Sequence, residues 1–89
     1  MARDIALVCD SAIPVGDLER CISRSGKGLV KEAELFDIYT GAPIPEGKKS
    51  VAFSLKLRSE DHTLTDAEAD EDVQAILAAL EAELGAVLR

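Results

Sequence analysis

The chain of 89 residues contains no tryptophan and no asparagine, and it has only one tyrosine and one histidine. His62 therefore has no second histidine with which to form a metal site or activate a nucleophile, and it is interpreted as a solvated loop residue. Cys9 and Cys21 form neither a C-x-x-C pair nor a metal-ligand cluster. Both lie at apolar-periodic positions, which predicts two buried, reduced thiols.

Long apolar runs are also missing. No stretch approaches the roughly 18 apolar residues of a membrane span, and residues 1–4 lack the pattern of a signal peptide. These absences predict a cytoplasmic protein without membrane contact. A chain this short removes only roughly 60 to 65% of its unfolded surface from water, so a large enclosed active site is not expected. Residues 1–89 are predicted to form a single domain.

Lysine and arginine are absent from residues 59–88, which contain nine acidic residues. The remainder of the chain carries 10 bases and 8 acids, a net charge of +2, although the whole chain has a net charge of −7. An acidic chain argues against a nucleic-acid partner. Its acidity is concentrated in one segment, however, so we expect the field to depend on which face a ligand meets.

The first part of the sequence predicts a strand followed by a helix. Residues 5–9 are a short apolar run rich in β-branched side chains, which is typical of a strand. A helix is predicted to begin at residues 14–17 and to end at Gly26. Its buried face has the i, i+3, i+4 spacing: Leu18, Cys21 and Ile22.

Two strands are predicted in the middle of the chain. Residues 29–39 alternate incompletely because Leu35 and Phe36 are adjacent apolar residues, and a bulge would reconcile the burial of both. This interpretation directs Phe36 and Ile38 toward the core. From Lys49 onward the alternation is clean and predicts a half-buried strand with these inward residues: Val51, Phe53, Leu55 and Leu57.

The last part predicts a long helix and a final strand. Residues 65–68 form a capping-box sequence, Gly85 ends the helix, and residues 86–89 are long enough for a strand. The acidic residues at 66–72 follow helical rather than loop-ligand spacing and are interpreted as a solvated helix face. The expected buried stripe consists of Val73, Ile76, Leu77, Leu80 and Leu84.

The order strand, helix, strand, strand, helix, strand predicts an α+β fold: a ferredoxin-like βαββαβ sandwich with a four-stranded antiparallel sheet and two helices on one face. The other face of the sheet is open. A small acylphosphatase-like hydrolase of this topology needs an Asn, which the chain lacks. A standard RNA-recognition motif is disfavoured, because its stacking positions would fall at the inward residues Val51 and Phe53.

Strand parity places four side chains on the open face. Ala6 supplies a small floor, Asp37 a hydrogen-bond acceptor, Tyr39 a stacking ring and Ser50 a hydroxyl. A carboxylate can accept from an amino or imino group at a base edge, and an aromatic ring can stack on a base. The alternative is that these are ordinary solvent-side residues, with Tyr39 paired across strands.

The segment Gly47-Lys48-Lys49-Ser50 is not a phosphate loop, because Ala42 rather than Gly stands five residues before Gly47 and a strand follows. A stiff hairpin loop is the simpler interpretation. Several basic side chains are candidate phosphate contacts: Lys48, Lys49, Lys56, Arg58 and Arg89.

Several motifs together resemble a known family. They are Asp4-Ile5-Ala6-Leu7-Val8, Phe36-Asp37-Ile38-Tyr39, Gly47-Lys48-Lys49-Ser50, Arg58, Thr63-Leu64-Thr65-Asp66 and Gly85-Ala86-Val87-Leu88-Arg89. In this order and spacing, the chain resembles over its whole length the ferredoxin-fold anticodon-binding domain that closes the β chain of bacterial phenylalanyl-tRNA synthetase.

The resemblance implies recognition of the anticodon of phenylalanine tRNA, chiefly its first base, by the positions Ala6, Asp37, Tyr39 and Ser50, with Tyr39 stacking. It implies no catalytic residue, metal or cofactor in this chain. Catalysis, with ATP and magnesium, belongs to the parent ligase, whose remaining β chain and α chain would be partners.

Two departures from the family pattern matter. His62 stands where the family commonly has Arg, which removes one potential phosphate contact. The chain also lacks the usual basic, proline-containing lead-in, so we expect a domain excised from a longer polypeptide. A rival hypothesis of a different class is a ferredoxin-like regulatory domain that senses a small molecule and dimerises through its sheet.

Overall fold

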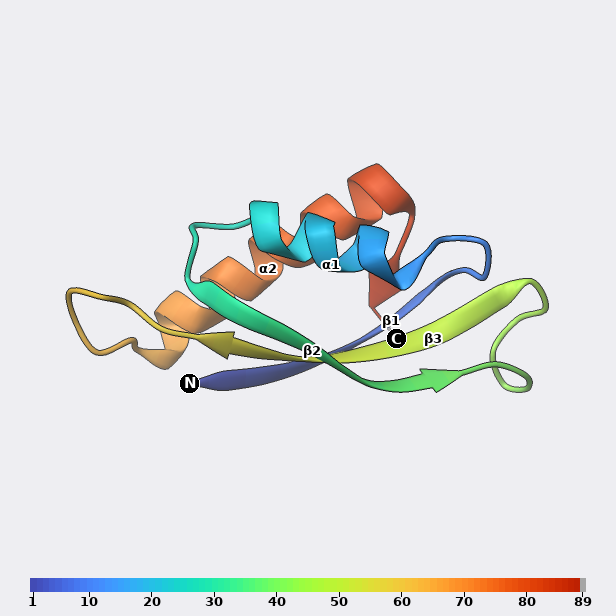
Figure 1. The fold of residues 1–89 in the computed structure, drawn as a ribbon, viewed down its shortest axis with the longest axis horizontal. Coiled ribbons are helices and arrows are strands. Elements are labelled where there is room, and N and C mark those ends of the chain that lie inside the picture. Colours follow the sequence, from blue (N-terminus) through green and yellow to red (C-terminus); the bar gives the residue numbers. More distant parts are fainter. Residues whose placement is uncertain (89) are drawn as a thin grey trace.

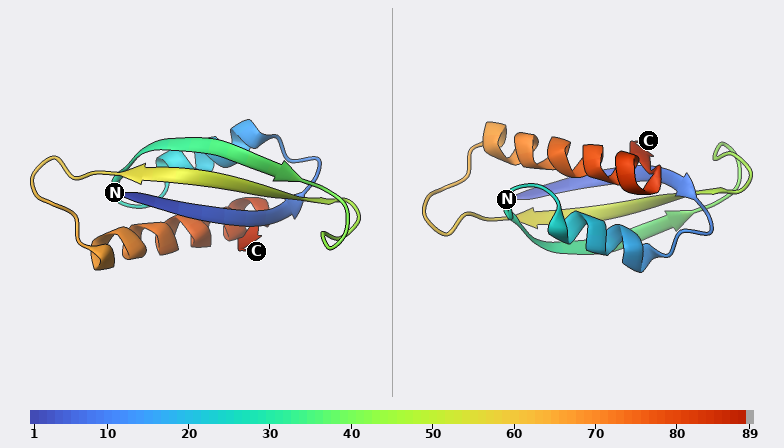
Figure 2. Two further views of the ribbon diagram at one scale, coloured as in Figure 1. Left: turned by 90° about the horizontal axis from the view of Figure 1, so that it is seen from below. Right: turned by 90° about the horizontal axis from the view of Figure 1, so that it is seen from above.

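The computed structural model describes residues 1–88 and contains the six elements in the predicted order. They are β1 (Ala2–Asp10), α1 (Val15–Arg24), β2 (Val30–Tyr39), β3 (Lys48–Leu57), α2 (Asp66–Leu84) and β4 (Val87–Leu88). The strands pair antiparallel in the order β2-β3-β1-β4. Both helices cover one face of this sheet and leave the other open, as Figure 1 and the two views of Figure 2 show. The predicted ferredoxin-like sandwich is confirmed.

The ends of several elements differ from the prediction. β1 begins at Ala2, three residues earlier than the apolar run indicated. α1 ends at Arg24 with Ser25 as its cap, so the predicted stop at Gly26 lies in the turn that follows. Arg89, the last residue of the predicted final strand and a candidate phosphate contact, lies outside the described residues.

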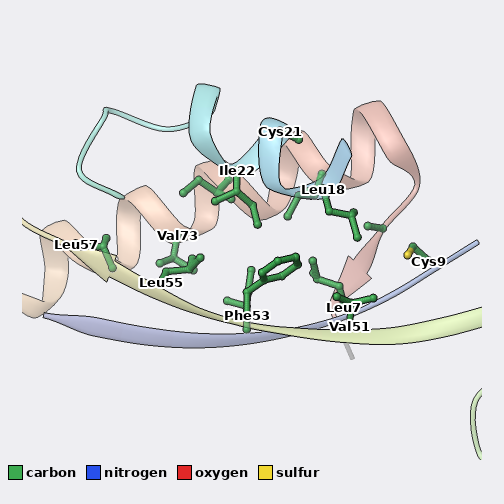
Figure 3. Close-up of a cluster of buried hydrophobic side chains, with 14 of the residues drawn as sticks. Leu7, Cys9, Leu18, Cys21, Ile22, Val51, Phe53, Leu55, Leu57 and Val73 are labelled. Carbon is green, nitrogen blue, oxygen red and sulfur yellow. The ribbon is translucent and has the colours of Figure 1, made fainter. Parts of the chain in front are cut away.

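The core lies between the sheet and the two helices. Phe53 is fully buried, and Leu18 and Ile22 of α1 point toward it from above (Figure 3). The inward residues predicted for β1 and β3 are buried: Ile5, Leu7, Cys9, Val51, Phe53, Leu55 and Leu57. Each large side chain buried in this way contributes about 1.5–3 kcal/mol through the hydrophobic effect. Strict alternation therefore fixes which face of the sheet the helices cover.

Both cysteines are free thiols without solvent exposure, as predicted. Burial raises the pKa of the Cys9 thiol, the largest of the influences on it. Cys9 and Cys21 therefore act as small apolar core residues, and Figure 3 shows them on opposite sides of the core layer, one on the sheet and one on α1.

The orientation predicted for Phe36 was wrong. The register between β2 and β3 shifts between Leu35, which pairs with Phe53, and Asp37, which pairs with Ala52. The predicted bulge is therefore present, but only Leu35 packs against the core, whereas Phe36 is 56% exposed. Alternation from the inward Leu35 sends Phe36 to the open face. The extra residue then keeps Asp37 on that same face.

The burial predicted for Ile38 was also wrong, for a different reason. Ile38 pairs with the buried Val51 and so lies on the helix-covered face, yet it is 50% exposed. Figure 1 shows that the β2–β3 hairpin extends past the first turn of α1, so no helix covers its end. Periodicity reports the face of a strand but not the extent of the layer packed on it.

Helix α2 has the predicted signals at both ends. The Thr65 side chain accepts from the Glu68 N–H, while the Glu68 carboxylate accepts from the Thr65 N–H, which completes the capping box. At the other end, Gly85 adopts the left-handed conformation with φ 66° and donates its N–H to the carbonyls of Leu80 and Glu81. These two caps mark the ends of the helix.

Asp72 corrects the interpretation of residues 66–72 as a solvated helix face. Its side chain is fully buried, and Oδ1 accepts a hydrogen bond from the backbone N–H of Lys27 in the turn after α1. Oδ2 has no hydrogen-bond partner among the described residues. Gly26 approaches so closely that an added Cβ would lie 2.3 Å from Asp72 Oδ1. The carboxylate therefore joins α2 to the α1–β2 turn.

Candidate nucleic-acid interface

The strand register gathers the four predicted site residues into two neighbouring rows on the open face. Side chains of directly paired residues share a face of the sheet. One row contains Asp37, Ala52 and Ala6, which pair in that order across β2, β3 and β1. The next row crosses all four strands and contains Tyr39, Ser50, Val8 and Val87. Parity thus predicted the placement of Ala6, Asp37, Tyr39 and Ser50 correctly.

Tyr39 is held by the loop that follows it. Its hydroxyl donates a hydrogen bond of 2.6 Å to the Ala42 carbonyl, and its side chain remains 41% exposed. The loop is itself anchored, since Ile44 is only 7% exposed and its N–H donates to the Gly41 carbonyl. The peptide bond between Ala42 and Pro43 is cis. An aromatic ring fixed before binding loses little side-chain freedom when a ligand stacks on it.

Ser50 is set more deeply than its place on the open face suggested. Only 3% of it is exposed, and it lies in register between Val8 and Tyr39. Its hydroxyl belongs to the floor of the face rather than to its rim. In the register, its row adjoins the row that contains the small residues Ala6 and Ala52.

The candidate phosphate contacts are only partly brought together: Lys56 and Arg58 line one shallow pocket, together with Lys31. Lys48 and Lys56 share the open face but stand eight residues apart on β3, about 26 Å for an extended strand. Lys49 pairs with the buried Cys9, and its Nζ donates to the Ile13 carbonyl, so it is directed to the helix side. Arg58 follows the end of β3 and is exposed. The described candidates therefore form one local basic group at the end of β3 that does not extend along the face to Lys48.

The open face carries acidic side chains of its own, in addition to those of the acidic segment 59–88. Asp4 and Glu34 both pair with Ser54, and Glu32 pairs with Lys56, whose Nζ lies 3.5 Å from its carboxylate. The open face therefore has two halves along the direction of the strands. Asp4, Glu32 and Glu34 lie in one half, and the two rows around Asp37 and Tyr39 lie in the other.

The acidic helix is partly neutralised by bases from other elements. Arg3 of β1 contacts Asp66 at 3.0 Å and Asp70 at 3.2 Å. Lys27 lies 3.5 Å from Glu71, and Arg24 forms an ion pair with Glu83. These exposed pairs contribute little stability individually. They do reduce the difference in charge between the two sides of the molecule.

His62 is an exposed loop residue, as predicted, and it also has close partners. Nε2 lies 2.6 Å from Glu68 Oε2, and Nδ1 lies 2.7 Å from Asp61 Oδ1. Its hydrogen bonds to Glu68 and, secondly, to Asp61 raise the pKa of His62. The pKa of Glu68 is lowered chiefly by His62, and that of Asp61 chiefly by Ser59 and then by His62. This cluster connects the β3–α2 loop to the first turn of α2.

Residues 1–88 contain no group of three His, Cys, Asp or Glu side chains arranged to hold a metal ion. Within the same residues, no helix is long and apolar enough to span a membrane. The geometry that remains is a twisted open sheet face with an acceptor, an anchored aromatic ring and a small-residue floor. Such a face suits a flat ligand with hydrogen-bond donors along one edge.

The fold and this face define an open-sheet α+β sandwich, and comparison with known proteins identifies its family. A model of the family described as "Ferredoxin-fold anticodon binding domain" matches residues 1–89. The chain belongs to this family of ferredoxin-fold anticodon-binding domains.

The chain is also similar to part of several bacterial proteins. It is 48% identical over 89 residues to the phenylalanine–tRNA ligase beta subunit of Geobacillus kaustophilus. This match covers 100% of the chain and 11% of that protein. The beta subunit of Clostridium tetani is 47% identical over 87 residues, 98% of the chain and 11% of that protein. The beta subunit of Bacillus subtilis is 46% identical over 89 residues, which are again 100% of the chain and 11% of that protein. The chain thus spans about a tenth of the length of these relatives.

Proposed function

We propose that this chain is a noncatalytic, tRNA-binding module of a phenylalanine–tRNA ligase β chain. It acts as a single domain, residues 1–89, and takes up the anticodon of phenylalanine tRNA, chiefly its first base, on the open sheet face during aminoacylation. The proposal rests above all on the whole-chain family match, combined with the two rows around Asp37 and Tyr39 on an uncovered sheet. The three relatives named above are ligase beta subunits, which favours this proposal over the rival small-molecule sensor.

In this proposal, the side chains of the two rows make different contacts with the base. The Asp37 carboxylate offers two acceptor oxygens to the imino and amino donors on the Watson–Crick edge of a guanine, the first base of the phenylalanine anticodon in the standard genetic code. Tyr39 stacks on the same base, and Ala6 with Ala52 leaves room for the base to lie close to the sheet. Ser50 contributes its hydroxyl from the floor.

Affinity for phosphate is expected to be low in the isolated chain. The net charge is −7, and of the candidate phosphate contacts only Lys56 and Arg58 lie together, at the opposite end of β3 from Lys48. Phosphate contacts dominate the affinity of most RNA complexes and make it dependent on salt. We propose that the remainder of the β chain and the α chain supply most of these contacts, as well as the catalytic site with its ATP and magnesium. The domain itself takes no cofactor, and the proposed compartment is the cytoplasm, where translation occurs.

The test uses the 89-residue chain and an RNA hairpin that carries the phenylalanine anticodon. Tyr39→Ala removes the stacking ring, and we expect affinity to fall by at least fivefold, which corresponds to about 1 kcal/mol. Replacing the first base by uracil should weaken the wild-type complex similarly. In the Asp37→Asn variant that preference should be reduced, because one acceptor oxygen becomes a donor. Affinity indifferent to both Tyr39→Ala and the base change would contradict the proposal.

A further inference from the structure

Phe36 is a large apolar side chain whose position the fold does not explain. It is 56% exposed and belongs neither to the buried core nor to the partly buried side chains packed against it. Burial of Phe36 therefore contributes little to folding. An exposed aromatic on the edge strand β2 is also a liability for unwanted strand pairing. Such a residue is better explained by something that binds it.

The bulge in β2 places Phe36 beside the proposed base-binding rows. Leu35 faces the core, so Phe36 faces the open side, and Asp37 follows on that side opposite Ala52. Tyr39 stands three residues farther along the same strand and face. The two rings are thus separated by about 10 Å along β2, with the Asp37 carboxylate between them. Without the bulge, Phe36 and Asp37 could not both reach this face.

The spacing leaves each ring for a different base. A base that stacks on Tyr39 with its edge at Asp37 occupies one side of the carboxylate, and Phe36 remains open on the other side. Proteins that bind single-stranded RNA loops splay neighbouring bases and stack them on separate aromatic side chains of a sheet. The acidic half of the face, with Glu34 and Asp4, begins beyond Phe36 and repels the phosphate backbone.

We infer that Phe36 is a second stacking residue, which holds the base adjacent to the one contacted by Asp37 and Tyr39. This inference rests on the proposed function and deepens it: the face takes two neighbouring unpaired bases rather than one. Phe36 supplies affinity through its ring face and no hydrogen bonds. Its contribution is therefore tolerant of base identity, whereas Asp37 discriminates between bases.

The test combines affinity with a local optical signal. The phenylalanine anticodon is G-A-A in the standard genetic code, so 2-aminopurine can replace the adenine at its second position in the RNA hairpin. Stacking of this base on an aromatic ring changes its fluorescence. We expect the wild-type chain to produce such a change. Phe36→Leu should abolish it and weaken binding about tenfold, equivalent to roughly 1.4 kcal/mol, while the preference for guanine at the first position is retained.

Two further variants serve as controls. Phe36→Tyr keeps the ring and should restore both affinity and the fluorescence change. Ile38→Ala removes an equally accessible apolar side chain, 50% exposed, from the opposite face of the same strand. Its affinity should equal that of the wild type. Because neither Phe36 nor Ile38 is buried, both variants should fold, which circular dichroism checks.

The outcomes separate the inference from the proposed function. If Phe36→Leu leaves affinity and fluorescence unchanged while Tyr39→Ala weakens binding, the second stacking site is wrong and the proposed function stands. If Ile38→Ala weakens binding as much as Phe36→Leu, the effect is non-specific and the inference fails. If Phe36→Leu removes the preference at the first base instead, Phe36 acts on that base and the inference is again wrong. Should neither ring nor the change of the first base affect affinity, both proposals fail.

Discussion

The two faces of the sheet are made by the same strands but obey different rules. On the helix-covered face, side chains such as Phe53 and Leu55 are fully buried, and their shape is matched to α1 and α2. On the open face, Phe36 and Tyr39 are exposed beside carboxylates and small residues. The first face specifies the fold, whereas the second can vary its chemistry without endangering it. This difference explains how a domain with so small a core can still present a binding surface.

The two phenylalanines provide the most direct test of this contrast. Phe53→Ala leaves a cavity in the core and should lower the free energy of unfolding by about 3–5 kcal/mol. Phe36→Ala should cost less than about 1 kcal/mol, because its side chain is mostly exposed in the folded state. Urea denaturation of the two variants measures the difference. Equal losses would mean that the open face is also part of the stabilising core.

Substitution of Gly26 tests whether the contact between the α1–β2 turn and Asp72 is packed as tightly as the apolar core. Gly26→Ala places a Cβ 2.3 Å from Asp72 Oδ1 at a residue with φ 76°. Gly28→Ala is the matched control, since Gly28 has φ 80° and no atom within 4 Å of the added Cβ. Both variants incur the left-handed cost of about 1–2 kcal/mol. We expect Gly26→Ala to lose a further 1–3 kcal/mol or so, as for an overpacked core.

Denaturation of both glycine variants gives this comparison directly. The additional loss in Gly26→Ala should become smaller when Asp72 is also changed to Ala, because the clashing carboxylate is then absent and only Ile76 Cγ1, at 3.2 Å, remains close to the added Cβ. Equal stability of the two single variants would show that Asp72 can move aside freely, and the close approach would then carry no energetic meaning.

His62 is expected to give the smallest effect, because its cluster is exposed. Its raised pKa means that its contribution to stability is complete below the ordinary value of 6.5 and is lost as pH rises through its folded pKa. The lowered pKa values of Asp61 and Glu68 add stability that is present above their ordinary values of 3.8 and 4.5 and is lost as pH falls. The cluster therefore stabilises most between about pH 4.5 and 6.5.

The measurement is thermal unfolding of the wild type and of His62→Gln at several pH values. The difference between them should be greatest near pH 5.5 and should decline as the pH rises above 6.5 and through the raised pKa of His62 in the folded state. Ser23→Ala, an exposed change on α1, serves as a control that should leave the pH profile unaltered. A difference independent of pH would contradict the role given to protonated His62.

The sequence was sufficient to predict the order of elements, the caps of α2 and the outward placement of Asp37, Tyr39 and Ser50. These follow from local signals: strand alternation, a capping box and a terminal glycine. The low exposure of Ser50 could not be predicted, since it depends on the side chains beside it on two other strands, β1 and β2.

The orientation of Phe36 was missed because a bulge shifts parity, and the sequence does not show which of two adjacent apolar residues takes the core position. The exposure of Ile38 depends on where α1 begins above the sheet, which is a property of the tertiary packing. Asp72 did leave a signal: it lies three residues after Ala69 and four before Ile76, both buried, so helical spacing places it on the inward stripe. The sequence interpretation placed Asp72 on the solvated face because of its charge, although its position in the helix indicated burial.

The central claim is that the ligand binds to the open face of the sheet, whereas the side chains of the helix-covered face stabilise the fold. It is tested most directly by following the backbone amide signals of the chain by NMR during titration with the phenylalanine anticodon hairpin. We predict that the largest shifts occur at residues of the open-face rows, in particular Ala6, Phe36, Asp37, Tyr39 and Ala52, and that α1 and α2 show only small changes. Shifts concentrated on the helices, with the open face unchanged, would contradict the account.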